Sequence, residues 1–138
     1  MKQHTTNYFN TLIEIAEDSP VEKAEVPASK KDVKTVAQLQ YELVAKHPYK
    51  YTSDDVIFLV HAQRNDLTRT EHKAARDVFF SKGQPCMRTS PLTKRYGFGV
   101  HADQNGKIAL YGAGTTEYDR LLKDESVKKV KAMRTSKK

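Results

Sequence analysis

The segment Asp103–Gly106 constrains the fold of this chain more than any other stretch of its sequence. Asn105-Gly106 is the dipeptide that most readily adopts the positive φ angles of a tight hairpin turn. Short runs rich in strand-forming residues lie on either side of it, at 96–100 and at 107–111. The sequence therefore predicts a β-hairpin over residues 96–111, and with it a sheet that contains an antiparallel pair.

Two glycines, Gly97 and Gly99, alternate with large apolar residues in the first strand of this hairpin. A glycine inside a strand leaves one face without a side chain, so another backbone, a helix or a ligand can approach closely there. A β-bulge is a further explanation. Strand glycines favour close packing or a bulge, and a bound ligand is the alternative.

Three segments have the apolar spacing of helices, in which buried residues recur every three or four positions. They lie between Thr35 and Pro48, from about residue 69 to residue 81, and from Thr115 or Thr116 onward. The second begins with a capping box, in which Glu71 reaches back to Thr68. Residues 126–133 are ambiguous, although the spacing of their apolar residues suits a helix.

Strand signals complete the pattern. Apolar alternation predicts a strand around residues 11–17. The apolar run Val56–Val60 is short and rich in β-formers, so a buried strand is favoured over 56–62. The element order is then β-α-β-α-β-β-α. It predicts an α+β domain with a mainly antiparallel or mixed sheet and with helices packed on one face.

A chain of 138 residues is long enough for one domain with its own core. Residues 1–127 are predicted to form that domain. The segment 19–34 contains two prolines and no aromatic residue, which predicts a mobile loop. Residues 128–138 are predicted to form a basic C-terminal tail, which is either a solvated, frayed end or an anion-binding segment.

The positive charge is distributed unevenly along the chain. The net charge is +7, and residues 128–138 contain six basic residues and no acidic one. A second stretch, Val78–Ala102, also lacks Asp and Glu, and it contains Lys82, Arg88, Lys94 and Arg95. Such an arrangement predicts a binding module for a polyanion, such as nucleic acid or a phosphorylated ligand.

The loop within this acid-free stretch is the best candidate for an anion site. Hydroxyl and cationic side chains alternate in it, and Pro91 favours a turn. Hydroxyls, free loop amides and a fork-shaped guanidinium suit phosphate or carboxylate. The predicted anion-binding residues are Arg88, Ser90, Thr93, Lys94 and Arg95. Solvation of an ordinary surface loop is the alternative explanation.

An enzyme acting on a small anionic substrate is the alternative function, with Cys86 or His101 as candidate catalytic residues. A catalytic cysteine needs a nearby cation or imidazolium to stabilise its thiolate, and Cys86 is close to Arg88 in the sequence. Cys86 is equally typical of a chain that enters the core, where a free cysteine is a small apolar residue. The sequence has no phosphate-binding loop, nucleophile elbow or metal-ligand spacing, so no cofactor and no metal are predicted.

One cysteine cannot form an internal disulfide, which favours a reducing compartment. The first ten residues, MKQHTTNYFN, lack the apolar core of a signal peptide, and no apolar run approaches the length of a membrane span. The sequence therefore predicts a soluble, cytoplasmic protein with no membrane partner.

Five longer motifs extend from one end of the chain to the other. They are Asn-Tyr-Phe-Asn at 7–10, Pro-Tyr-Lys-Tyr-Thr-Ser-Asp-Asp at 48–55, Ser-Lys-Gly-Gln-Pro-Cys at 81–86, Ser-Pro-Leu-Thr-Lys-Arg-Tyr-Gly at 90–97 and Lys-Val-Lys-Ala-Met-Arg at 129–134. These motifs resemble a family of short bacterial proteins that is catalogued as a domain of unknown function. The resemblance implies a bacterial protein that forms one complete domain, and it implies no activity, cofactor or catalytic residue.

Overall fold

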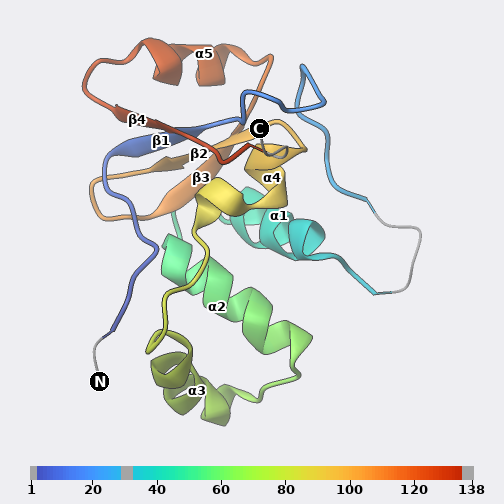
Figure 1. Ribbon diagram of the computed structural model, residues 1–138, viewed down its shortest axis with the longest axis vertical. Coiled ribbons are helices and arrows are strands. Elements are labelled where there is room, and N and C mark those ends of the chain that lie inside the picture. Colours follow the sequence, from blue (N-terminus) through green and yellow to red (C-terminus); the bar gives the residue numbers. More distant parts are fainter. Residues whose placement is uncertain (1–2, 29–32, 135–138) are drawn as a thin grey trace.

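A mixed four-stranded sheet with the strand order β3-β2-β1-β4 lies at the centre of the computed structural model, which describes residues 3–28 and 33–134 (Figure 1). Along the chain the elements are β1 (Thr11–Glu14), α1 (Val36–Lys46), α2 (Ser53–Arg64), the 3-10 turn η1 (Arg69–Glu71), α3 (His72–Phe79), the 3-10 turn η2 (Met87–Thr89), α4 (Pro91–Lys94), β2 (Phe98–Ala102), β3 (Ile108–Gly112), α5 (Thr116–Lys123) and β4 (Lys128–Lys131). Helices combined with a mixed sheet confirm the predicted α+β class.

The predicted hairpin is present as β2 and β3, which pair antiparallel over all five residues of each strand. In the turn between them Gly106 has a φ of +80°, a conformation that glycine adopts without steric cost. The Asp103 carboxylate accepts hydrogen bonds from the backbone amides of Asn105 and Lys107, both at 2.9 Å. The hairpin therefore forms from the local turn chemistry that its sequence predicts.

Strand β1 lies between β2 and β4, antiparallel to the first and parallel to the second. Its neighbouring residues Leu12 and Ile13 point to opposite faces of the sheet. Ile13 packs in a buried cluster with Val44 of α1 and Val56 of α2, whereas Leu12 packs against Tyr118 of α5. Both faces of β1 are therefore buried.

Helices cover both faces of the sheet as a result. Figure 1 shows α5 on one side and α1, α2 and α4 on the other. The prediction that all helices pack on one face is wrong, because a strand with apolar residues on both faces needs cover on both sides. The predicted helices themselves are present as α1, as η1 followed by α3, and as α5.

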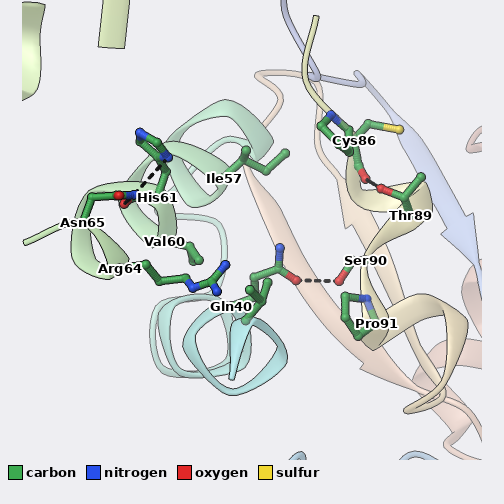
Figure 2. A pocket seen from close by; sticks show the side chains of 12 residues that line it. Gln40, Ile57, Val60, His61, Arg64, Asn65, Cys86, Thr89, Ser90 and Pro91 are labelled. Atoms are coloured by element: carbon green, nitrogen blue, oxygen red, sulfur yellow. Dashed lines mark hydrogen bonds between the residues drawn. The ribbon is translucent and has the colours of Figure 1, made fainter. Parts of the chain in front are cut away.

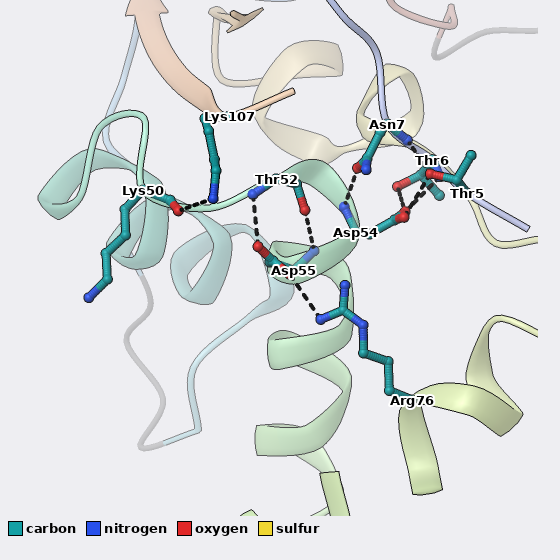
Figure 3. A network of polar contacts seen from close by, with 9 residues as sticks. All are labelled: Thr5, Thr6, Asn7, Lys50, Thr52, Asp54, Asp55, Arg76 and Lys107. Carbon is teal, nitrogen blue, oxygen red and sulfur yellow. Dashed lines mark hydrogen bonds and ion pairs between the residues drawn. The ribbon is translucent and has the colours of Figure 1, made fainter. Parts of the chain in front are cut away.

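The predicted strand at 56–62 is also wrong, because Ser53–Arg64 form helix α2. A capping box starts this helix: the Thr52 hydroxyl accepts from the Asp55 amide at 3.1 Å, and the Asp55 carboxylate accepts from the Thr52 amide at 3.0 Å (Figure 3). Every residue of the run 56–60 is buried or half-buried. Such a run has no clear period, so apolar pattern alone does not separate a buried helix from a strand.

Two carboxylates in the first turn of α2 anchor other parts of the chain (Figure 3). Asp54 accepts hydrogen bonds from the Thr6 amide at 2.6 Å and from the hydroxyls of Thr5 and Thr6 at 2.7 Å. Asp55 forms a 2.9 Å ion pair with Arg76 of α3. Burial raises the pKa of Asp55, but the hydrogen bonds of the helix cap and the Arg76 charge outweigh this effect, so its pKa is lowered overall.

The predicted basic tail begins with a strand. Residues Lys128–Lys131 form β4, in which Val130 lies opposite Ile13 of β1. The domain therefore extends beyond residue 127, and the frayed end predicted from residue 128 onward is wrong for β4. Local pattern does not reveal this strand, because its partner β1 is distant in sequence and its lysines are typical of a sheet edge. Residues 135–138 of the predicted tail lie outside the described residues.

The described parts of the predicted loop, residues 19–28 and 33–34, contain no helix or strand. Its backbone attaches to the end of the hairpin, since the Ala24 amide donates to the Ala113 carbonyl at 3.1 Å and the Glu25 amide donates to the Tyr96 carbonyl at 2.9 Å. The mobility predicted for 19–34 stays a prediction, and residues 29–32 lie outside the described part of the chain.

Gly97, which directly precedes β2, and Gly99 within β2 are sites of close packing. A Cβ atom on Gly99 would lie 2.4 Å from Cε1 of Tyr118, and one on Gly97 would lie 2.9 Å from Cγ2 of Val21. Both distances are too short for non-bonded carbon atoms. Of the explanations considered for these glycines, close packing is therefore confirmed.

Candidate functional site

Two of the predicted anion-binding residues, Ser90 and Thr93, use their hydroxyls inside the protein. Ser90 is buried, and its hydroxyl donates to Oε1 of Gln40 at 2.5 Å while accepting from the Leu92 amide at 3.1 Å. Thr93 is fully buried and donates to the Met87 carbonyl at 2.8 Å. These hydroxyls stabilise η2 and α4 and are not available to a ligand. An anion bound at this loop would therefore contact the cationic side chains of the loop.

The predicted cations are more accessible, and Arg88 connects the two basic segments of the sequence. Its Nε donates to the Lys131 carbonyl of β4 at 2.7 Å, and its own carbonyl accepts from the Met133 amide at 2.8 Å. Lys94 is half-buried and Arg95 is exposed. Arg88 of the acid-free stretch therefore lies beside the end of β4 in the basic C-terminal segment.

We define the basic surface by its members Arg88, Lys94, Arg95, Lys131 and Arg134. One acidic residue interrupts it, since the Glu17 carboxylate lies 3.9 Å from Nζ of Lys131. The neighbouring Lys129 is not part of this surface, because its ammonium group donates to the carbonyls of Asp124 and Val127, at 2.6 and 2.7 Å. The cations of the basic surface are partly or fully exposed to solvent.

The structure does not bring Cys86 and His101 together. Cys86 precedes Met87, which packs on the same face of the sheet as Ile13, whereas His101 lies opposite Leu12 on the other face. The Cys86 thiol is half-buried, and its sulfur lies 3.7 Å from the Tyr8 hydroxyl. These two candidate catalytic residues therefore cannot act as a pair in this conformation.

His101 belongs instead to a polar cluster on the α5 face. Its Nδ1 lies 2.8 Å from the Tyr49 hydroxyl, which lies 2.7 Å from the Tyr111 hydroxyl. Its buried Nε2 has no hydrogen-bond partner among the described residues. Burial lowers the pKa of His101, against the smaller opposing effects of Asp103 and Asp124. The arrangement favours neutral imidazole.

A pocket of about 470 Å³ lies between α1, α2 and the segment 85–91 (Figure 2). Its lining residues are Val36, Gln40, Ile57, Val60, His61, Arg64, Asn65, Pro85, Cys86, Thr89, Ser90 and Pro91. Figure 2 shows the Cys86 sulfur pointing away from the pocket. The sequence does not predict this site, because four of its twelve lining residues lie on α2, a segment whose pattern predicts a strand. In helical numbering, positions 57, 60, 61 and 64 share one face.

Within residues 3–28 and 33–134 there is no group of three or more His, Cys, Asp and Glu side chains placed to hold a metal ion. No helix in the same ranges is both long and apolar enough to cross a membrane.

The fold and its charged edge define a single-domain α+β protein with a mixed sheet and a basic surface beside β4. The sequence profile of a family of unknown function, DUF6157, matches residues 3–138, and the chain belongs to that family. Comparison with curated proteins and with solved structures gave no match. Membership confirms the family of unknown function that the motifs resemble, and the functional argument depends on the residues of this chain.

Proposed function

We propose that the protein is a binding module for a polyanion, with nucleic acid as the leading candidate, and that the ligand lies on the basic surface. The observation that supports this most directly is the contact of Arg88 with β4, which places a cation of the acid-free stretch beside the basic C-terminal segment. Cations that contact phosphates release condensed counterions, and this release provides most of the affinity in sequence-independent binding. The single cysteine supports a reducing, cytoplasmic compartment. The motif resemblance supports a bacterial origin of the protein.

The charges of the basic surface suit phosphate contacts that do not read sequence. Lys94, Arg95 and Lys131 are side chains on a sheet edge and a short helix, and they can adapt to a backbone of repeated charges. Glu17 opposes such a ligand because its carboxylate lies beside Lys131. Neutralising Glu17 should therefore strengthen binding, whereas neutralising the cations should weaken it.

Charge-matched variants test the proposal in fluorescence anisotropy titrations with labelled single- and double-stranded oligonucleotides. The test variant is K94Q/R95Q/K131Q, and the control is K46Q/R69Q/K73Q, which removes the same charge from exposed positions outside the basic surface. We expect the test variant to reduce the salt dependence of log K by about one for each lost phosphate contact. Deleting residues 128–138 is a poor alternative because it removes β4.

The control should bind almost as tightly as the native protein, and Glu17→Gln should bind more tightly. Equal weakening by both triple variants would show that net charge alone drives the interaction. That result, or no binding at low salt, would overturn the proposal.

An enzyme that uses Cys86 or His101 is the alternative function, and the separation of these two residues on opposite faces of the sheet weighs against their joint action. Substitution Cys86→Ser should leave oligonucleotide binding unchanged, because it removes no cation of the basic surface and the serine hydroxyl can still contact the Tyr8 hydroxyl.

A further inference from the structure

The pocket between α1 and α2 is lined by a side-chain amide, that of Gln40, whose oxygen is bonded to Ser90. Gln40 is 7% exposed, and its Oε1 accepts the hydrogen bond from the Ser90 hydroxyl at 2.5 Å. The Ser90 hydroxyl thus donates to Gln40 while its oxygen accepts from the Leu92 amide. The Nε2 of Gln40 is therefore directed away from Ser90, and Figure 2 shows it facing the pocket.

The Gln40 side chain forms its hydrogen bond to Ser90 through Oε1, and its Nε2 is not among the buried polar atoms that lack a partner in the described ranges. This Nε2 is therefore open to solvent on the pocket side. Water accepts from this group when the pocket is free, and a ligand with an acceptor oxygen can take the place of that water. The pocket thus presents a donor that the protein itself does not use.

Arg64 supplies a second donor group to the same pocket. It lies in the last turn of α2, and Figure 2 shows its side chain extending toward Gln40. It forms no ion pair with another described residue. Among the described residues that line the pocket, none is Asp or Glu and Arg64 is the only lysine or arginine. The polar side of the pocket therefore favours an acceptor that carries a single negative charge.

Five apolar residues also line the pocket, beside the polar His61, Asn65 and Thr89. These five are Val36, Ile57, Val60, Pro85 and Pro91. The volume of about 470 Å³ lies within the range of roughly 300 to 1,000 Å³ that is typical of sites for small organic ligands. A ligand that uses both kinds of wall has an apolar body and an anionic end.

We propose that this pocket binds a small organic carboxylic acid, whose carboxylate contacts Arg64 and the Gln40 amide and whose apolar body contacts Ile57, Val60 and Pro91. A planar carboxylate matches the planar donors of a guanidinium and an amide. A phosphate dianion would call for a second strong cation, which the described lining lacks. The site is separate from the basic surface, so the two proposals can fail independently.

Amide and side-chain NH₂ resonances of the native protein, followed by NMR, test the proposal with phenylacetate as the probe. Phenylacetamide is the neutral control of the same shape, and phenyl phosphate is the doubly charged one. We expect phenylacetate to shift the Gln40 side-chain resonances and the backbone resonances of 57–64 and 85–91. Phenylacetamide should bind at least about tenfold more weakly, because it lacks the charge that pairs with Arg64.

The variant Arg64→Gln should weaken phenylacetate binding about tenfold to a hundredfold, while Arg69→Gln removes the same charge outside the pocket and should have no effect. Because Arg64 is exposed, the variant should fold normally, and a native-like dispersion of its NMR spectrum would confirm this. Equal affinity for phenylacetate and phenylacetamide, tighter binding of phenyl phosphate, shifts outside the pocket, or no shifts at millimolar probe would each overturn the assignment. Unchanged oligonucleotide binding by Arg64→Gln would distinguish this site from the basic surface.

Discussion

Replacing Gly99 of β2 with alanine should destabilise the protein strongly, because the new methyl group has no space. The Cβ would lie 2.4 Å from Cε1 and 3.0 Å from Cδ1 of Tyr118, and 3.2 Å from the Ile13 carbonyl oxygen. The Tyr118 ring is buried between α5 and the sheet, and its hydroxyl accepts a hydrogen bond from the Ile15 amide at 3.1 Å. Relief of the clash therefore moves the ring and breaks this bond, or separates β1 from β2.

The expected cost is the sum of two effects. Overpacking a core position costs about 1–3 kcal/mol, and loss of the hydrogen bond to the buried side of the sheet adds about 1 kcal/mol. The lower chain entropy of alanine in the unfolded state returns about 0.4–1 kcal/mol. We expect a net loss of about 1–3.5 kcal/mol, which corresponds to a lowering of Tm by roughly 3–12 °C for a domain of this size.

Urea denaturation followed by circular dichroism measures this loss. Gly83→Ala is the matched control, because a Cβ at Gly83 meets nothing within 4 Å and should change stability by less than about 0.5 kcal/mol. In a double-mutant cycle, Gly99→Ala and Tyr118→Phe should be less than additive, since both remove the same hydrogen bond. A Gly99→Ala loss below about 0.5 kcal/mol, or equal losses at Gly99 and Gly83, would refute the reasoning.

Two further perturbations test the polar contacts. Asp54→Ala should cost about 1–3 kcal/mol, because it leaves the buried Thr6 amide without its acceptor, and hydrogen exchange at the Thr6 amide should accelerate. Asp119→Ala on the exposed face of α5 is the control, and unchanged exchange at Thr6 in the Asp54 variant would contradict the network. Burial lowers the folded-state pKa of His101, so below about pH 6.5 the unfolded chain binds more protons than the folded protein. The free energy of unfolding should therefore fall as the pH drops from about 6.5 toward the folded-state pKa. His101→Phe should flatten this pH dependence, and an unchanged slope in urea titrations at several pH values would contradict it.

The parts of the fold that the sequence predicts correctly depend on neighbouring residues. The Asp103–Gly106 turn forms from its own hydrogen bonds, and Thr35 caps α1 with a capping box that involves Gln38. The errors occur where the structure of a segment depends on partners that are distant in the sequence. Strand β4 exists because β1 offers it a parallel neighbour, and α5 lies on the second face because Leu12 needs cover there. Propensity and pattern do not contain this information.

The two candidate sites also differ in how far they can be predicted from local sequence. Arg88 and Lys94 could be selected from sequence because cations without acidic neighbours are visible in a single stretch of chain. Gln40 could not, since its role depends on Ser90, which reaches it only when α4 packs beside α1. A helix assigned to 53–64 would have placed Ile57 and Arg64 on one face, yet a face alone does not identify a site. The pocket becomes a binding hypothesis through one contact between distant residues, because Ser90 occupies the Gln40 oxygen and leaves the amide donors directed at the cavity.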